Sequence, residues 1–356
     1  MPEVDTVYPA DALEFCPHPA AQDIFVCGTY KLDDASEDPA AASSSPQHRR
    51  GQCLVFAVQD TDEPTILKLQ EIDLPAVPDM KWCHQSESNN PLLGVANSEG
   101  RVTLHEWESN ERTLRQLADI ECASSDILCL SLDWSNRRYA GTGTCSLVVS
   151  LSNGQLALLQ PDDRNLAVTQ LWHAHDYEPW IAAWDYWNTN LIYSGGDDLQ
   201  LKCWDVREGF SKPVFLNRRF EAGVTTLQSN PHREHLIAVG SYDTSVRLYD
   251  SRKAVAPVGT ADVGGGVWRV KWHPSPLRAN DLLVACMHDG FKVLHFDGAD
   301  KAPMQLQGTV TKRFDDHQSL AYGADWSYAK TTTNQTDQTL IGSCSFYDHK
   351  LCLWRG

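Results

Sequence analysis

Several large classes of protein are excluded by what the sequence lacks. No stretch is apolar enough to span a membrane, and no signal peptide precedes the first strand-like segment, so we expect neither a membrane partner nor secretion. The motifs GxSxG and HExxH and the phosphate-binding P-loop are absent. Lys and Arg number 30 against 47 acidic residues and form no sustained stripe, which argues against nucleic acid as a partner.

Cysteine usage points to a reducing compartment. The eleven cysteines are an odd number without a CxxC pair, and Cys27, Cys53, Cys203 and Cys352 fall inside strand-like segments. We therefore expect reduced, buried thiols in a cytoplasmic protein, and neither a metal site nor a cofactor. The net charge of −17 serves solubility or steers a cationic partner.

A unit that ends in a turn, an aspartate and a strand recurs about every 45 residues. Asp198, Asp243 and Asp289 hold equivalent places, 45 and 46 residues apart, and Trp-Asp follows at 204–205. Short strands at this period are typical of the four-stranded blades of a WD40 β-propeller. One blade cannot bury both faces of its sheet alone, so the repeats must pack around a ring.

The series extends over the whole chain, and we expect residues 1–356 to form a single propeller domain of seven blades. Glu99, Asn153 and Asp348 take the place of the aspartate in other units. The innermost strands are marked by Phe15, Trp82, Trp134, Tyr186, Ser229, Trp272 and Trp326. The last blade lacks a fourth strand, so we expect Val4–Tyr8 to pair there and close the ring without an open edge.

Three irregular segments fit this scheme as loops. Residues 33–50 (DDASEDPAAASSSPQHRR) lie between the second and third strands of the first blade, and their Ala, Ser and Pro content predicts a disordered loop rather than a domain boundary. Asn136–Cys145 and Lys330–Gln338 are expected to be long loops between the first and second strands of their blades.

Some segments are more specific than the WD repeat itself. They include WHAHDYEPWIAAWDYWNTNLIYSGGDD (172–198), VGGGVWRVKWHP (263–274) and ACMHDGFKVL (285–294). Together these segments closely resemble the diphthine methyl ester hydrolases, the WD-repeat proteins of diphthamide biosynthesis that are also called diphthine methyltransferases. The resemblance covers the whole chain and is strongest over residues 172–296.

The resemblance implies a function. Members of the family remove the methyl ester from methylated diphthine, a modified histidine of elongation factor 2, and expose the carboxylate that is later amidated. The expected partner is therefore elongation factor 2, and no cofactor is implied. The substrate side chain carries a quaternary trimethylammonium group beside the ester.

We expect substrate to bind at one end of the central channel. A quaternary ammonium cannot donate a hydrogen bond, so aromatic rings and carboxylates are the groups that hold it. The candidates at this end are Glu178, Trp180, Asp197, Tyr242, Trp268, Tyr322 and Tyr347. For any one of these rings, packing between blades is the competing explanation.

Ester hydrolysis needs a base and a group that stabilises the oxyanion. His288 is our candidate for the base, because generic WD repeats rarely carry a histidine in this turn. Arg269 is the candidate for the oxyanion donor, and it would later bind the product carboxylate.

Two other histidines are expected to be structural. His175 stands where a WD repeat carries its Gly-His dipeptide, and with Ser194, Asp198 and Trp204 it should form the hydrogen-bonded tetrad that locks a blade. His317 is expected to act in the same way.

A second class of function stays open. Arg207 and Arg252 end consecutive blades in a D-x-R pattern, which resembles the doublet by which WD-repeat receptors dock on the adaptor of a cullin-type ubiquitin ligase. Alternatively, both arginines only pair with carboxylates at the strand ends. A non-catalytic scaffold or receptor would release no methanol from the ester.

Overall fold

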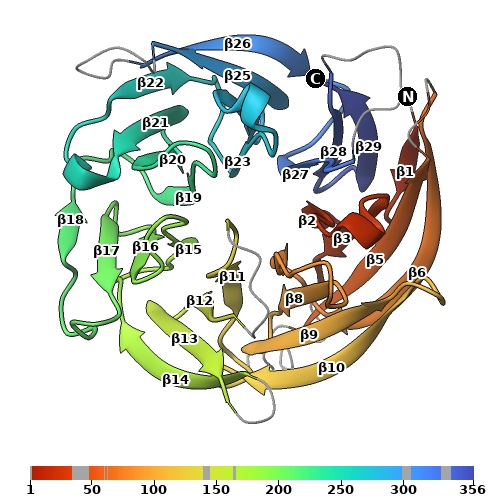
Figure 1. The fold of residues 1–356 in the computed structure, drawn as a ribbon, viewed down its shortest axis with the longest axis horizontal. Coiled ribbons are helices and arrows are strands. Elements are labelled where there is room, and N and C mark those ends of the chain that lie inside the picture. The colour runs from red at the N-terminus through yellow and green to blue at the C-terminus, as the bar shows by residue number, and fades with distance from the viewer. Residues whose placement is uncertain are drawn as a thin grey trace, which may run out of the picture.

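The computed structural model is a ring of antiparallel sheets around a common centre (Figure 1). The residues that it describes are 2–33, 48–59, 61, 63–138, 145–162, 166–298, 306–329 and 338–356. Within these ranges the only helices are short 3-10 turns at Pro19–Ala21, Ser251–Lys253 and Pro276–Arg278. None of the described helices is long and apolar enough to cross a membrane. The prediction of an all-β propeller is confirmed.

Most sheets consist of four strands that follow each other in the chain. In chain order the units are β2 (Ala10–Phe15), β3 (Ile24–Thr29), β5 (Arg49–Gln59) and β6 (Thr65–Pro75), with β4 (Lys31–Leu32) beside β5; β7 (Asp79–Trp82), β8 (Leu92–Ala96), β9 (Arg101–Glu108) and β10 (Thr113–Glu121); β11 (Cys129–Trp134), β12 (Leu147–Leu151), β13 (Gln155–Pro161) and β14 (Leu166–His173); β15 (Ile181–Trp184), β16 (Leu191–Gly195), β17 (Leu201–Asp205) and β18 (Phe215–Asn217); β19 (Val224–Ser229), β20 (Leu236–Ser241), β21 (Ser245–Asp250) and β22 (Gly259–Asp262); β23 (Arg269–Trp272), β24 (Asp281–Ala285), β25 (Phe291–Asp297) and β26 (Leu306–Phe314); and β27 (Ala321–Trp326), β28 (Leu340–Ser345) and β29 (Lys350–Arg355) with β1 (Glu3–Asp5).

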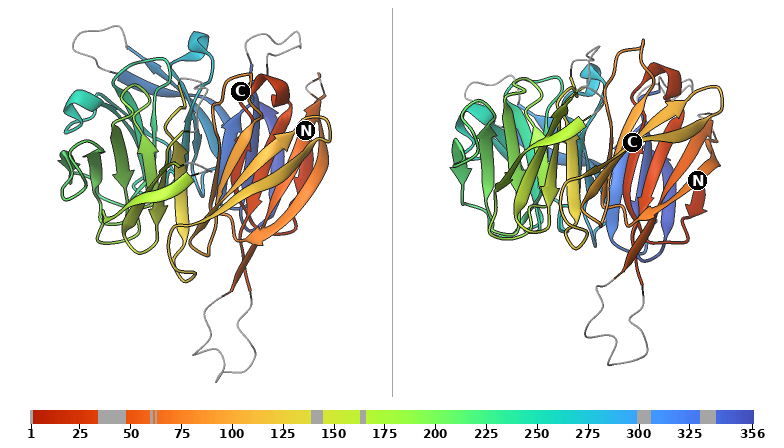
Figure 2. Two further views of the ribbon diagram at one scale, coloured as in Figure 1. Left: turned by 60° about the horizontal axis from the view of Figure 1, so that its bottom comes forward. Right: turned by 90° about the horizontal axis from the view of Figure 1, so that it is seen from below.

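Two of these units are joined at their outer strands. β22 and β26 pair in parallel, Gly259 with Leu306 and Thr260 with Gln307, which gives one sheet of eight strands. With that sheet divided at the junction, the described strands form seven units around the ring. Figure 2 shows the sheets side on, with their strands running between the two faces of the ring.

The N-terminal strand closes the ring, as predicted. β1 pairs antiparallel with β29, Glu3 opposite Cys352 and Asp5 opposite Lys350. The paired strand is shorter than the expected segment up to Tyr8, because Val7 has a φ of 65° and an extended strand cannot continue through that conformation.

The segment expected to be a disordered loop lies largely outside the described residues. At its C-terminal border β5 already begins at Arg49, and Asp33 binds His48 and Arg50 at 2.8 and 2.7 Å. The described residues of 33–50 therefore continue the pairing of the sheet and do not belong to a loop. The loops expected at 136–145 and 330–338 also fall mostly outside the described ranges.

Tryptophans fasten neighbouring blades together at the inner wall of the ring. Trp82, Trp134, Trp184, Trp272 and Trp326 each end an innermost strand, and each indole N–H donates to a backbone carbonyl of the preceding blade at 2.8–3.3 Å. Since every indole is buried, an unmade bond would cost about 1–3 kcal/mol, which fixes the blade spacing. In the fourth unit this place belongs to Trp184, and not to Tyr186 as the sequence suggested.

Candidate active site

The two histidines that compete with His288 are structural. His175 is fully buried, with its ring nitrogens 2.8 Å from Asp198 Oδ1 and 2.7 Å from Ser194 Oγ. The Trp204 indole donates to the same hydroxyl at 2.9 Å, which completes the predicted tetrad. His317 is held in the same manner between two serine hydroxyls of its own blade, at 2.5 and 2.8 Å. Both predictions are confirmed.

A cavity of about 220 Å³, which we name the aromatic cavity, lies at the end of the channel where the innermost strands begin. Its lining is Asp11, Tyr30, Pro78, Leu128, Leu130, Trp180, Trp268, Arg269, Tyr322 and Phe346. Six of these residues (Asp11, Pro78, Leu130, Trp180, Trp268 and Tyr322) stand four places before the aromatic residue that ends their strand. One position of the repeat therefore supplies most of the cavity wall.

Three of the wall residues are placed by β-bulges. Asp11, Leu130 and Tyr322 are each the extra residue in a register shift between the first and second strands of their blades. A bulge turns its extra side chain out of the alternation of the strand, and here it faces the channel. Bulges therefore decide which side chains face the cavity at these positions.

The aromatic side chains of the cavity touch one another in an arc. Trp268 stacks on Tyr322 with ring centroids 4.7 Å apart, and the Trp180 ring is tilted against Trp268 at 5.6 Å. Tyr322 in turn contacts Phe346 at 5.3 Å, and Tyr242 approaches Trp268 to 6.2 Å. Ring faces in such an arc attract an organic cation that carries no hydrogen-bond donor.

The chain before Trp268 passes so close to neighbouring backbone that it requires a run of glycines. A Cβ at Gly265 would lie 2.1 Å from the carbonyl oxygen of Cys286, and Gly264 has a φ of +78°. Only glycine allows the chain to pass so close to β24 and then turn Trp268 into the cavity. The VGGGVWR segment is therefore part of the site rather than an ordinary loop.

Arg269 begins β23 and is 7% exposed. Its Nη2 donates to the carbonyl oxygen of Pro78 at 3.1 Å and to Asp79 Oδ1 at 3.3 Å. The other guanidinium nitrogens have no hydrogen-bond acceptor among the described residues. Because a guanidinium carries five N–H donors, Arg269 retains donors for a ligand in the cavity.

Asp11 is the carboxyl group that the sequence reasoning missed. It is 6% exposed, and burial raises its pKa to about 7, although Arg269 and the Trp268 indole act in the opposite direction. Its Oδ1 meets no well-formed hydrogen bond within the described parts of the chain. A buried carboxyl that titrates near neutral pH is a candidate general base. The sequence does contain a signal for it, because Asp11 stands four residues before Phe15, the same repeat position that supplies the other wall residues.

Four of the predicted residues meet in the aromatic cavity, namely Trp180, Trp268, Arg269 and Tyr322. Tyr242 joins them through Trp268. Asp197 lies close by, because a Cβ at Gly223 would come within 2.2 Å of Asp197 Oδ1 and 3.1 Å of the Tyr242 ring.

Three other candidates stand farther out. Glu178 accepts the backbone N–H of Asp197 through its carbonyl at 3.0 Å, and its charge adds to the burial that raises the pKa of Asp197. Tyr347 is 71% exposed and touches Phe346. His288 is exposed in the turn between β24 and β25, and it is not among the residues that line the cavity.

The D-x-R arginines lie at the opposite end of the strands from Trp180. Arg207 follows β17 and binds Asp205 at 2.6 Å, while Arg252 follows β21 and binds Asp250 at 2.5 Å. Both arginine side chains nevertheless remain 62% exposed. Each arginine thus pairs with its own strand-end carboxylate and still faces solvent.

Comparisons with known proteins agree with this architecture. A family model described as "WD domain, G-beta repeat" matches residues 215–250. A chain in the crystal structure of the mitotic checkpoint complex superimposes with a TM-score of 0.69 over 99% of this chain and 90% of its own length. Its 17% sequence identity makes this a likeness of fold alone.

The sequence relatives are more specific. "Diphthine methyltransferase" of Mus musculus is 41% identical over 334 residues, which cover 91% of this chain and 69% of the relative. Its counterpart in Schizosaccharomyces pombe is 31% identical over 349 residues, 98% of this chain and 95% of the relative. A "DDB1- and CUL4-associated factor 11 homolog" of Caenorhabditis briggsae is 26% identical over 220 residues, covering 50% of this chain and 40% of the relative.

Proposed function

Since the chain belongs to the diphthine methyltransferase family, we propose that it hydrolyses the methyl ester of methylated diphthine on elongation factor 2. The relatives' names support an enzyme that acts on diphthine, and the ester hydrolysis is our assignment. The observation that carries it is the aromatic cavity, where an arc of rings, a buried arginine and a buried carboxyl with a pKa of about 7 meet.

The aromatic arc suits the trimethylammonium group of the substrate. This group cannot be held by hydrogen bonds, so it is recognised by ring faces within about 6 Å and by negative charge. Trp180, Trp268 and Tyr322 provide the faces, and Asp197 adds a half-buried carboxyl nearby. The net charge of −17 attracts the same cation from a distance.

Asp11 and Arg269 suit the ester. In the proposed reaction Asp11 takes a proton from a water molecule while the water oxygen attacks the ester carbon, and the C=O bond becomes an oxyanion. Arg269 donates to that oxyanion. The C–OCH₃ bond then breaks, and the leaving methoxide receives the proton from Asp11. The first products are methanol and the carboxylic acid, and the acid then loses its proton to solvent and becomes the carboxylate.

Substrate binding would itself activate the base. An opposite charge within about 4–6 Å favours the ionised form of a carboxyl. A trimethylammonium group on the aromatic arc would therefore lower the pKa of Asp11 from its value of about 7. More of the protein then holds an ionised base when substrate is bound than when the cavity is empty.

The role of His288 as base stays a prediction. Its turn is near the rim, where a large protein substrate would cover it, but in the structure it stands outside the cavity. The deciding experiment supplies purified protein with elongation factor 2 that carries methylated diphthine, and measures methanol release by wild type, Asp11→Asn and His288→Ala. An intact ester in the presence of wild-type protein, under conditions where a related family member cleaves it, would refute the assignment.

A receptor role in a ubiquitin ligase is the second candidate function. It is favoured by the exposure of Arg207 and Arg252 at the end of the ring opposite the aromatic cavity, so both roles are compatible. The name of the worm relative supports it, since that protein is called DDB1- and CUL4-associated. The test is binding of purified DDB1 to wild type and to the double variant Arg207→Ala, Arg252→Ala. No binding by wild type excludes this role, and equal binding by both proteins excludes docking through the two arginines.

A further inference from the structure

A second and larger cavity lies at the other end of the channel. It has a volume of about 370 Å³ and is lined by Arg137, Tyr186, His84, His232 and Tyr328, among others. Tyr186 follows the end of β15, whereas Trp180 precedes its beginning, so this cavity and the aromatic cavity open at opposite ends of the innermost strands. We name it the arginine cavity.

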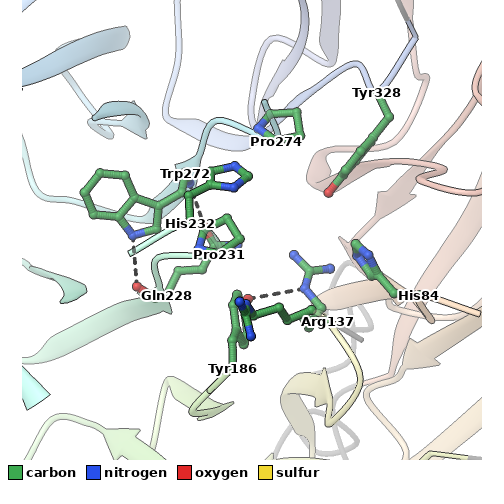
Figure 3. A pocket seen from close by; sticks show the side chains of 10 residues that line it. His84, Arg137, Tyr186, Gln228, Pro231, His232, Trp272, Pro274 and Tyr328 are labelled. Atoms are coloured by element: carbon green, nitrogen blue, oxygen red, sulfur yellow. Dashed lines mark hydrogen bonds between the residues drawn. The ribbon is translucent and has the colours of Figure 1, made fainter. Parts of the chain in front are cut away.

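Arg137 is the central charge of this cavity. Its side chain is 6% exposed, and its Nε donates to the Tyr186 hydroxyl at 3.2 Å. Asp133 is the nearest carboxylate, with Oδ1 4.0 Å from the same Nε. The two terminal nitrogens have no hydrogen-bond acceptor in the described part of the chain, and Figure 3 shows the end of the guanidinium turned toward the cavity. A buried guanidinium with an unused fork is poised for an oxyanion.

Two neutral donors lie beside the fork. Figure 3 shows the Tyr328 hydroxyl and the His84 ring turned toward the guanidinium of Arg137. His84 Nε2 is buried without a hydrogen-bond partner among the described residues. Burial, with a further contribution from Arg137, holds the pKa of His84 well below its ordinary value, so its ring is neutral at physiological pH. In the tautomer protonated at Nε2 the ring donates, and the site then presents donors from three side chains.

The remaining wall is uncharged or cationic. None of the described residues that line the cavity is Asp or Glu, although the protein as a whole carries a net charge of −17. Trp272, Pro231 and Pro274 contribute the apolar part of the lining, on the side away from His84 (Figure 3). Such a wall suits a ring or a short apolar group attached to the anion.

Buried ion pairs separate the two cavities. Between them Glu14 binds Lys81 at 2.9 Å and also Lys271, and Lys81 binds Asp79 at 2.6 Å. Although burial opposes it, Lys271 and Lys81 lower the pKa of Glu14 to about 2, so its charge persists. The space beside these side chains is about 20 Å³, room for about one water molecule. The arginine cavity and the aromatic cavity share no lining residue among those that the structure describes, so they are two separate sites.

We propose that the arginine cavity binds a small organic oxyanion, a carboxylate or a phosphate monoester. The terminal nitrogens of Arg137 hold the anionic group, Tyr328 and His84 donate to it, and the apolar part lies against Trp272. Pairing with Asp133 alone does not account for Arg137, because that contact is long and leaves the fork unused. The site is independent of the ester chemistry at the other end of the ring.

The test is calorimetric titration of the full chain at constant ionic strength with benzoate, AMP and inorganic phosphate. We expect benzoate or AMP to bind with a dissociation constant below about 1 mM and inorganic phosphate to bind more weakly. A preference for benzoate identifies a carboxylate ligand, and a preference for AMP a phosphate monoester. Arg137→Gln should weaken binding at least about tenfold, because a charge-assisted pair is lost. Arg112→Gln is the matched control, since Arg112 follows β9 at the same end of the ring and is half exposed.

Two further variants keep the proposal testable if Arg137→Gln fails to fold. Tyr328→Phe removes a hydroxyl that makes no hydrogen bond to the described residues, and it should weaken binding severalfold without loss of stability. Arg137→Lys keeps the charge but not the fork, and it should weaken binding as well. The proposal is overturned if no organic probe binds saturably, if these variants bind as tightly as wild type, or if Arg112→Gln weakens binding as much as they do.

Discussion

The two ends of the channel are formed by the same strands but have opposite chemistry. The end where the innermost strands begin presents Trp180, Trp268, Tyr322 and the carboxyl of Asp11. The end where these strands finish presents arginines and histidines around Arg137. One repeat thus offers two positions for side chains that face a cavity, one before and one after its innermost strand.

Loss of Arg269 should produce the largest effect at the aromatic end. Arg269→Ala is expected to lower kcat by about 10²–10³-fold, because it removes the proposed oxyanion donor. Single-turnover methanol release measures the effect, and circular dichroism checks the fold. Arg115→Ala is the control, since that side chain is 58% exposed on β10. A kcat within about threefold of wild type would show that Arg269 is not the oxyanion donor.

Asp11→Asn should lower turnover by about 10²-fold, because an amide cannot accept the proton of water. In the proposed reaction the ionised form is the base, and burial raises the pKa of Asp11 to about 7. In wild type, kcat/KM should therefore fall as the pH drops below about 7 and level off above it. A pH profile from 5 to about 9 tests the sign. If His288→Ala abolishes activity while Asp11→Asn retains it, the base is His288.

His175→Ala tests whether His175 stabilises its blade and takes no part in the chemistry at either end of the channel. It breaks a buried tetrad, so the free energy of unfolding should fall by about 2–4 kcal/mol. Thermal unfolding measures this loss. The matched control is His173→Ala, whose side chain is 64% exposed. Abolished esterase activity without loss of stability would instead place His175 in the reaction.

Removing one aromatic ring from the cavity wall should have the smallest effect on the reaction. Trp180→Ala and Tyr322→Ala are each expected to weaken substrate binding by about 1–2 kcal/mol, seen in KM rather than kcat, because only contact with the ammonium is lost. A substrate analogue without the positive charge should bind wild type and both variants almost equally. If the charged and uncharged analogues lose the same affinity, the rings act by packing alone.

The sequence by itself determined the repeat, the closing strand at the N-terminus, the tetrad around His175 and four residues of the aromatic cavity. All of these follow from periodicity or from a local motif, since a strand, a turn and a blade-locking histidine are specified within about one repeat. The D-x-R pairs were likewise local, because each arginine binds an aspartate two residues away.

Only the tertiary structure brings out Asp11 and Arg137, to which we assign the base and the anion site. The place of Asp11, four residues before Phe15, marks it as a wall residue but does not predict its raised pKa, and a bulge aims it into the channel. Its raised pKa comes from burial, with Arg269, from a blade far away in sequence, as its nearest countercharge. Arg137 acquires its neighbours His84 and Tyr328 in the same way, from other blades. Closing the ring brings these groups together and removes them from water, and no spacing along the chain encodes that event.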